Sequence, residues 1–158
     1  RKNMKWKKPP IIKIYEALGA IADERITITE TSTSARVYSS SGNKYYEVSY
    51  DPENQAIMSN DNASYWKGTL GYPAIAFLLT KGVLKYRADI AILLKGIAWK
   101  DINQKYRNDF EKTLQHIENS LERSEWENLS EYTESLSKAI DALDLNHLGK
   151  QKMPPQGY

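Results

Sequence analysis

The residue types that usually carry catalysis or bind metal ions are sparse in this chain. It contains no cysteine, which excludes disulfides, iron–sulfur clusters, thiolate zinc sites and a cysteine nucleophile. Its two histidines, His116 and His147, are far apart, and neither has a partner at the i+3 or i+4 spacing that places two metal ligands on one helix face. The sequence therefore predicts no metal site and no cofactor.

Acid–base and phosphate chemistry also lack a recognisable arrangement. The carboxylates cluster in residues 118–134, where they alternate with apolar positions, so we expect them on the solvated face of a helix. Gly68 and Gly71 precede a predicted helix, but the lysine of a P-loop and the third glycine of a dinucleotide fingerprint are missing. The hydroxyls of residues 31–41 have no histidine or lysine placed to activate them. We therefore expect a protein that is not an enzyme.

Charge is distributed unevenly along the chain, whose net charge is +2. Residues 81–107 carry seven basic and two acidic side chains, whereas residues 111–144 carry nine acidic and three basic ones. Basic side chains neutralise phosphates, and aromatic side chains stack on bases. The basic segment, together with residues 65–67, which include two aromatic side chains, therefore predicts a nucleic-acid-binding surface. Its candidate residues are Tyr65, Trp66, Lys67, Lys81, Lys85, Arg87, Lys95, Lys100, Lys105 and Arg107.

Residues 89–102 resemble a helix-turn-helix motif, in which a short helix ends at a turn glycine and a second helix begins about three residues later. Gly96 takes the place of the turn glycine, although Ile92 stands where typical examples have a small residue. Several side chains of the second helix are of types that contact base edges or phosphates. Those predicted to point outward are Lys100, Asn103, Gln104, Lys105 and Arg107.

Hydrophobic periodicity indicates the elements that would position these residues. Apolar residues recur at helical spacing over residues 10–22, behind a double proline, and predict a first helix. From residue 24 the period changes to two, and strands rich in β-branched and aromatic residues are predicted at 25–29, 36–38, 46–50 and 55–59. Gly42 and Pro52 lie in the predicted turns of an antiparallel meander. Residues 60–71 are predicted to be a loop that packs its two large aromatic side chains.

The second half of the chain is predicted to be helical. Pro73 and Gly82 mark the start and the cap of one helix, and residues 87–95 form a second short helix. Apolar residues three or four apart predict one long helix over residues 99–121, and a capping box from Ser124 to Glu127 predicts the start of another. The predicted fold class is α+β: an N-terminal helix, a four-stranded antiparallel meander, then helices that end in a long antiparallel helical hairpin.

The length fits one domain over residues 1–158. We divide it into residues 9–82 with the meander, residues 83–148 with the helical part, and a tail at 149–158. No apolar run reaches the roughly 20 residues of a membrane span, and the basic residues 1–8 are not followed by the apolar stretch of a signal peptide. With the absence of cysteine, these features predict a cytoplasmic protein without a membrane partner.

Residues 44–79 resemble a SWIM-type zinc finger in the order of two strands, an aromatic loop and a helix. That family has a Cys-x-Cys knuckle after its strands and a Cys-x-His pair that opens its helix. The four ligand positions fall on Met58, Asn60, Tyr72 and Ala74, none of which supplies the family's ligand. The resemblance implies a metal-free descendant with nucleic-acid or protein partners, and the alternative is a coincidental ββα layout. An apolar core would replace the zinc, formed by Tyr46, Ile57, Ile75 and Phe77 or their neighbours.

Two function classes are compatible with these observations. The leading one is a non-enzymatic binding or adaptor domain that binds nucleic acid through residues 81–107. The alternative is a protein-interaction or homodimerisation module that uses the C-terminal helical hairpin, with Trp99 and Trp126 as anchors. An enzyme would instead require a concave pocket that holds carboxylates away from solvent.

Overall fold

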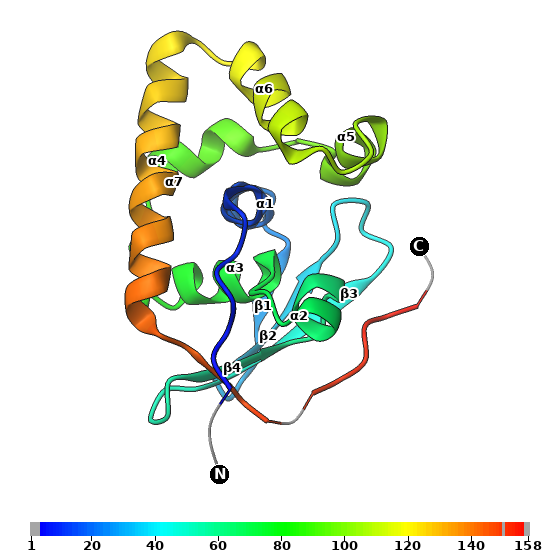
Figure 1. Ribbon diagram of the computed structural model, residues 1–158, viewed down its shortest axis with the longest axis vertical. Helices are drawn as coiled ribbons and strands as arrows, with labels where there is room; N and C mark the ends of the chain where they lie inside the picture. Colours follow the sequence, from blue (N-terminus) through cyan, green and yellow to red (C-terminus); the bar gives the residue numbers. More distant parts are fainter. Residues whose placement is uncertain (1–3, 150, 157–158) are drawn as a thin grey trace.

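The computed structural model describes residues 4–149 and 151–156, which form one sheet with helices mainly on one of its faces (Figure 1). The first half of the chain contains α1 (Ile11–Ala22), β1 (Ile26–Ile28), β2 (Ser34–Tyr38), β3 (Tyr45–Asp51), β4 (Ala56–Ser59), α2 (Asn62–Lys67) and α3 (Tyr72–Thr80). The second half contains α4 (Ala88–Ala91), the 3-10 helix η1 (Ile92–Leu94), α5 (Trp99–Lys105), α6 (Phe110–Ser120), α7 (Arg123–Leu143) and β5 (Asn146–His147).

The predicted N-terminal helix and the antiparallel meander are confirmed. β1, β2, β3 and β4 pair in that order, each antiparallel to the next, with Val37 opposite Tyr46 and Tyr50 opposite Ile57. A fifth strand, β5, lies parallel to β4, so the sheet is five-stranded and mixed rather than a pure meander. β5 has only two residues, too few to produce a periodic signal in the sequence.

α3 lies at the centre of the molecule. Residues 73–79 are all buried, because α3 packs against the sheet on one side and against α1 on another (Figure 1). A helix that is apolar all round is stable only where each of its sides is covered. Pro73 stands in its first turn and Gly82 follows its end with a φ of +77°, as the sequence predicted.

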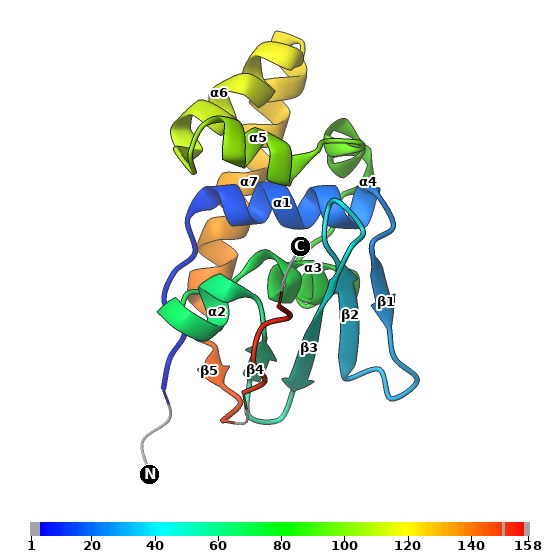
Figure 2. The same ribbon diagram turned by 90° about the vertical axis from the view of Figure 1, so that its right-hand side faces the viewer.

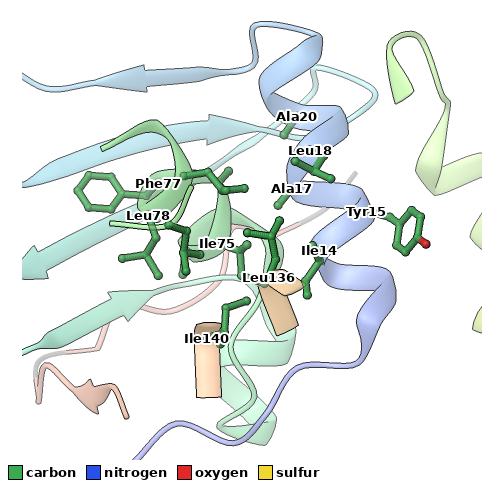
Figure 3. Close-up of a cluster of buried hydrophobic side chains, with 14 of the residues drawn as sticks. Ile14, Tyr15, Ala17, Leu18, Ala20, Ile75, Phe77, Leu78, Leu136 and Ile140 are labelled. Carbon is green, nitrogen blue, oxygen red and sulfur yellow. The ribbon is translucent and has the colours of Figure 1, made fainter. Parts of the chain in front are cut away.

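The main core forms where α1, α3 and α7 meet. Ile14 and Leu18 of α1, Ile75 of α3, and Leu136 and Ile140 of α7 gather there (Figure 3), and none of them is more than 6% exposed. α7 therefore packs its apolar stripe against both α1 and α4. Burial of each such aliphatic side chain contributes roughly 1.5–3 kcal/mol.

The predicted single helix over residues 99–121 is wrong, because the chain breaks into α5 and α6. Arg107 and Asn108 have φ values of 52° and 62°, a left-handed conformation that cannot continue an α-helix. Asp109 then starts α6, since its side chain accepts from the N–H of Lys112. The apolar spacing continues across this break, so periodicity alone joined the two helices.

The predicted antiparallel hairpin is also not formed. α6 contacts α5 and diverges from α7 below their connection (Figure 1), while α7 packs against α1 and α4. The apolar stripe of α7 is thus covered by elements from the first half of the chain. The capping box lies two residues earlier than predicted: the Glu122 side chain accepts from the N–H of Glu125, whose own side chain accepts from the N–H of Glu122 at 3.0 Å.

The predicted loop at residues 60–71 contains α2, which is held by a buried polar network. Asp61 Oδ1 accepts from the hydroxyls of Ser59 and Ser64, both at 2.6 Å, and Asp61 Oδ2 accepts from the N–H of Ser64. Ser64 Oγ accepts from the N–H of Gly71 at 3.0 Å. The network joins the end of β4, the start of α2 and the start of α3.

Both described ends of the chain lie against the sheet. Trp6 stacks on His147 of β5 with ring centroids 3.7 Å apart. Residues 151–156, part of the predicted tail, run in front of β3 and β4 on the face opposite the helices (Figure 2). There Lys152 Nζ lies 2.9 Å from Glu47 Oε1. The segment thus covers part of the sheet face opposite α3 (Figure 2).

Gly71→Ala should destabilise the fold more than Gly82→Ala. A Cβ at Gly71 would overlap the carboxylate of Asp61 and break its network, at a cost of roughly 2–4 kcal/mol. A Cβ at Gly82 meets nothing within 4 Å, so only its φ of +77° is penalised, by about 1–2 kcal/mol. Urea unfolding followed by circular dichroism measures both losses. An equal or smaller loss for Gly71→Ala would contradict this account of the contact.

Candidate functional site

A cleft of about 310 Å³ is lined by residues of α1, α2, α5 and the turn between β2 and β3. We call it the α1–α5 cleft. α1 supplies Lys13 and Glu16 to its lining, and α5 supplies Trp99, Lys100 and Asn103. Tyr72, the first residue of α3, lines the same cleft, so residues that are far apart in the sequence meet here.

Glu16 is the buried carboxylate of the cleft, with only 6% of the residue exposed. Its Oε1 lies 3.3 Å from Lys13 Nζ, and its Oε2 accepts from Asn103 Nδ2 at 3.0 Å. Asn103 Oδ1 in turn accepts from the hydroxyl of Thr113 in α6. Asn103, predicted to point outward toward nucleic acid, is therefore turned into the cleft, because it bridges α1 to α6.

Arg25 enters the cleft just before β1. Its Nη1 donates to the carbonyl oxygen of Tyr38 at 2.6 Å, and its Nε lies 3.6 Å from Asp23 Oδ2. A separation of 3.6 Å is too long for a hydrogen bond. The Nε–H is buried and has no acceptor among the described residues. The guanidinium therefore keeps one donor unused inside the protein.

Tyr46 and Tyr72 form an aromatic wall, with ring centroids 6.0 Å apart and an edge-to-face geometry. Burial raises the pKa of Tyr46 to about 12, and the nearby carboxylates of Asp61 and Glu16 add to the shift. Burial also raises the pKa of Tyr72, a shift that Tyr46 increases and Arg25 opposes. Both hydroxyls therefore keep their protons at neutral pH and remain hydrogen-bond donors.

Trp99 closes the side of the cleft next to α1. It is only 3% exposed, and its indole lies so close to Gly19 that an added Cβ would come within 2.5 Å of Nε1. The missing side chain of Gly19 thus allows α1 and α5 to approach each other. In the described part of the chain, the indole Nε1–H has no hydrogen-bond acceptor. Trp99 packs within its own chain, away from the surface where a partner anchor would stand.

The turn between β2 and β3 forms the opposite rim. Ser40 Oγ accepts from the N–H of Lys100 at 3.3 Å, which joins the turn to the start of α5. Lys44 Nζ lies 5.7 Å from the centroid of the Tyr46 ring, a cation–π contact. The charged side chains of the lining are Lys13, Arg25, Lys44 and Lys100 against Glu16 and Asp61. Basic groups therefore outnumber carboxylates by four to two.

The structure divides the predicted nucleic-acid-binding residues into two groups. Lys81, Lys85 and Arg87 follow the C-terminal end of α3, and the N–H of Arg87 donates to the hydroxyl of Tyr132 in α7. This first group lies beside α7, on the opposite side of α1 from α5 (Figure 1). Lys95 is exposed in the segment between the two groups.

The second group surrounds the α1–α5 cleft. Lys100 lines it, and Lys105 and Arg107 are exposed next to the lining residues Gln104 and Asn108. The remaining three residues, Tyr65, Trp66 and Lys67, belong to α2, whose first turn also lines the cleft.

The segment that resembles a helix-turn-helix folds as α4, η1 and α5. Gly96 adopts a φ of +82°, as a turn glycine would. α5 does not stand clear of the molecule, because Trp99 is buried against α1 and Asn103 bonds to Glu16. Its start is joined to the β2–β3 turn by Ser40.

Trp126, the second predicted interaction anchor, is partly buried in α7. It stacks on Tyr15 of α1 with ring centroids 5.9 Å apart. Tyr15 OH in turn accepts from the hydroxyl of Thr133. Trp126 thus helps to hold α7 against α1.

Several residues of the cleft carried no recognised signal in the sequence, above all Glu16, Arg25 and Tyr72. Glu16 has one usable signal, since it stands four residues after the buried Ile12 and three before Gly19, on the same face of α1. A carboxylate on that face has to meet a polar partner from another element. No sequence pattern identifies that partner as Asn103.

The described residues contain no group of three or more His, Cys, Asp or Glu side chains arranged to hold a metal ion. Within the same residues, no helix combines the length and the apolar character that crossing a membrane requires.

The fold and the cleft define an α+β domain whose mixed sheet is backed by helices and bordered by a polar, net-basic cleft. The chain belongs to the family described as Uncharacterised conserved protein UCP014422, whose model matches residues 6–146. No curated protein and no solved structure matches it. The SWIM resemblance of residues 44–79 stays a prediction; at one of its ligand positions, Asn60 Oδ1 accepts from the N–H of Glu47 at 2.7 Å.

Tyr46→Phe should make stability less sensitive to alkaline pH. The pKa of Tyr46 is about 12 in the folded protein and about 10 when unfolded, so the folded state holds the proton more tightly. The resulting stability is complete below pH 10 and is lost as the pH rises through 12, by at most about 1.4 kcal/mol per pH unit. Urea unfolding between pH 9 and 11.5 measures this loss, with the exposed Tyr45→Phe as control. An alkaline loss that is unchanged in Tyr46→Phe would refute the assignment.

Proposed function

We propose that this protein is a non-enzymatic binding domain that holds single-stranded nucleic acid along the α1–α5 cleft. The observation that carries the proposal is the excess of basic over acidic side chains in the lining of this cleft. The exposed Trp66 belongs to α2, whose first turn lines the same cleft. Phosphate neutralisation supplies most of the affinity of such proteins, and stacking on aromatic side chains adds to it.

The basic surface extends beyond the cleft. Lys105 and Arg107 are exposed at the end of α5, and Lys105 Nζ lies 5.2 Å from the ring centroid of Tyr106. A nucleic-acid strand that follows the cleft would therefore meet basic side chains both in the cleft lining and at the end of α5. Residues 81–87 lie on the opposite side of α1 from α5 (Figure 1). The proposed path therefore uses only the second half of the predicted basic segment.

Trp66 supplies the stacking platform. It is 65% exposed, the highest exposure among the described aromatic side chains, and Tyr65 meets its ring edge to face at a centroid distance of 4.7 Å. An exposed indole offers a large, flat apolar surface that a partner can cover. A nucleobase provides such a cover without any sequence requirement.

A single strand fits this surface better than a duplex. In helix-turn-helix proteins the N-terminal residues of the recognition helix contact base edges in the major groove. In α5 these residues are Trp99, which is buried, and Lys100, whose N–H bonds to Ser40 of the β2–β3 turn. The β2–β3 turn thus keeps the major groove of a duplex away from the start of α5. Unpaired bases, by contrast, can reach the cleft and Trp66.

The alternative, association through the C-terminal helices, has less support. α7 buries its apolar stripe on α1 and α4, and Trp126 stacks on Tyr15. None of the described large apolar side chains that are exposed lies on α6 or α7. A partner would therefore find no apolar anchor on these helices.

Binding is also favoured over catalysis. The cleft does hold buried carboxylates, as an enzyme would require, but both are occupied. Glu16 pairs with Lys13 and Asn103, and Asp61 accepts from the hydroxyls of two serines. Both serines are buried, at 3% and 0% exposure, and Ser64 Oγ also accepts from the N–H of Gly71, so their hydroxyls hold the fold together and do not face a substrate. We further propose the cytoplasm as the compartment, in keeping with the absence of cysteine.

Replacing Lys44 and Lys100 together by Gln should weaken the binding of a labelled single-stranded oligonucleotide. The slope of log affinity against log salt should fall by about 1.4, since each phosphate contact to a single strand contributes about 0.7. The control, Lys81→Gln with Lys85→Gln, removes the same charge outside the cleft and should leave the slope unchanged. Fluorescence anisotropy across a salt series measures both. Equal effects of the two pairs, or wild-type binding that is insensitive to salt, would refute the proposal.

Trp66→Ala should reduce the same affinity by roughly 5- to 150-fold, because stacking of one base on an aromatic ring is worth about 1–3 kcal/mol. Trp66→Phe should retain most of the affinity, since it keeps a ring. Both variants should melt at the wild-type temperature, because the side chain is largely exposed. The proposal loses its stacking step if Trp66→Ala binds as tightly as the wild type.

A further inference from the structure

Three residues that line the α1–α5 cleft each carry a buried side-chain atom that makes no hydrogen bond within the described residues: Trp99 Nε1, Arg25 Nε and Glu16 Oε1. Glu16 Oε1 is ion-paired with Lys13, and Arg25 Nε lies 3.6 Å from Asp23 Oδ2. An unsatisfied buried donor or acceptor costs about 1–3 kcal/mol. Buried polar groups are nearly always hydrogen-bonded, yet three of the four exceptions among the described residues belong to residues that line this cavity.

We propose that this cavity is a binding site for a small organic oxyanion, a phosphate or carboxylate compound that also carries hydroxyl groups. The proposal goes beyond nucleic-acid binding, because it rests on the buried floor of the cleft rather than on its exposed rim. A phosphate and a carboxylate present the same oxygen acceptors, and the experiment below separates the two.

The donors of the floor match an oxyanion. Trp99, Arg25, Tyr46 and Tyr72 all line the cavity, and both phenols are protonated at neutral pH. Trp99 Nε1–H and Arg25 Nε–H make no hydrogen bond within the described residues. Arg25 also brings positive charge, which strengthens a hydrogen bond to an anionic oxygen. Indole, guanidinium and phenol are rigid groups, so the ligand would not have to order them on binding.

Glu16 accounts for the hydroxyl groups of the ligand. A carboxylate repels an oxyanion but accepts a hydrogen bond from a hydroxyl. Lys13 neutralises its charge at 3.3 Å, while Asn103 holds its second oxygen. Oε1 thus remains an acceptor with a fixed position, next to the donors that face an anionic group.

The size of the cavity agrees with such a ligand. Its volume of about 310 Å³ lies at the lower end of the roughly 300–1,000 Å³ that is usual for small-molecule sites. A sugar phosphate or a hydroxy acid fits within that space.

Isothermal titration calorimetry on the full chain tests the proposal with four probes: ribose 5-phosphate, tartrate, inorganic phosphate and ribose. Ribose 5-phosphate or tartrate should bind saturably and at least tenfold more tightly than inorganic phosphate, while neutral ribose should not bind. The stronger of the two identifies the anion as phosphate or carboxylate. Absence of binding by both at millimolar concentrations, or equal binding of ribose, would overturn the proposal.

Matched variants locate the site. Tyr46→Phe removes one donor of the floor and should weaken binding about 10- to 100-fold, as expected for a hydrogen bond to a charged group. Tyr72→Phe provides a second test of the same wall. Tyr45→Phe, the neighbouring exposed tyrosine, should bind as the wild type does. Equal affinities in all three variants would overturn the assignment to this cavity. Oligonucleotide binding is measured separately, so either proposal can fail while the other stands.

Discussion

The burial of α3 on all of its sides is the constraint on which the rest of the structure depends. Seven consecutive residues, 73–79, are buried, so the helix offers no polar face to water. The sheet covers one side and α1 another, and α7 then covers α1. An element that failed to cover α3 would expose several aliphatic side chains, each worth roughly 1.5–3 kcal/mol. The order of the layers therefore follows from the composition of one short helix.

The same constraint explains where the cleft lies. The N-terminal end of α3 is fixed by the Asp61 network, which reaches Gly71 through Ser64. Tyr72 is the first residue of α3, and the elements that cover this end bring Glu16 and Tyr46 to its side. Polar groups thus converge where the apolar helix begins. The opposite end of α3 leads into residues 81–87, whose basic side chains are exposed to solvent.

Sequence patterns predicted those elements whose periodicity is local. The meander and α1 follow from alternation and from helical spacing, and each is bounded by turn residues such as Gly42 and Pro10. The break between α5 and α6 was missed because Arg107 and Asn108 leave the helical conformation without interrupting the apolar spacing. The pairing of α7 with α1, like that of Glu16 with Asn103, depends on contacts between distant segments, which no local period encodes. The residues of the predicted basic surface are divided between two places in the fold for the same reason, since a charged segment of sequence need not lie on one face.

The rim and the floor of the cleft are electrostatically coupled, which links the two proposed ligands. The lining of the cleft holds four basic side chains against two carboxylates, so it carries net positive charge. An oxyanion on the floor would neutralise part of that charge, and the field that attracts a phosphate backbone to the rim would weaken. Because linkage is reciprocal, a bound strand would lower the affinity of the oxyanion by the same factor. The buried donors of the floor, which cost stability while they are empty, would then act as the element through which a small molecule controls the nucleic-acid surface.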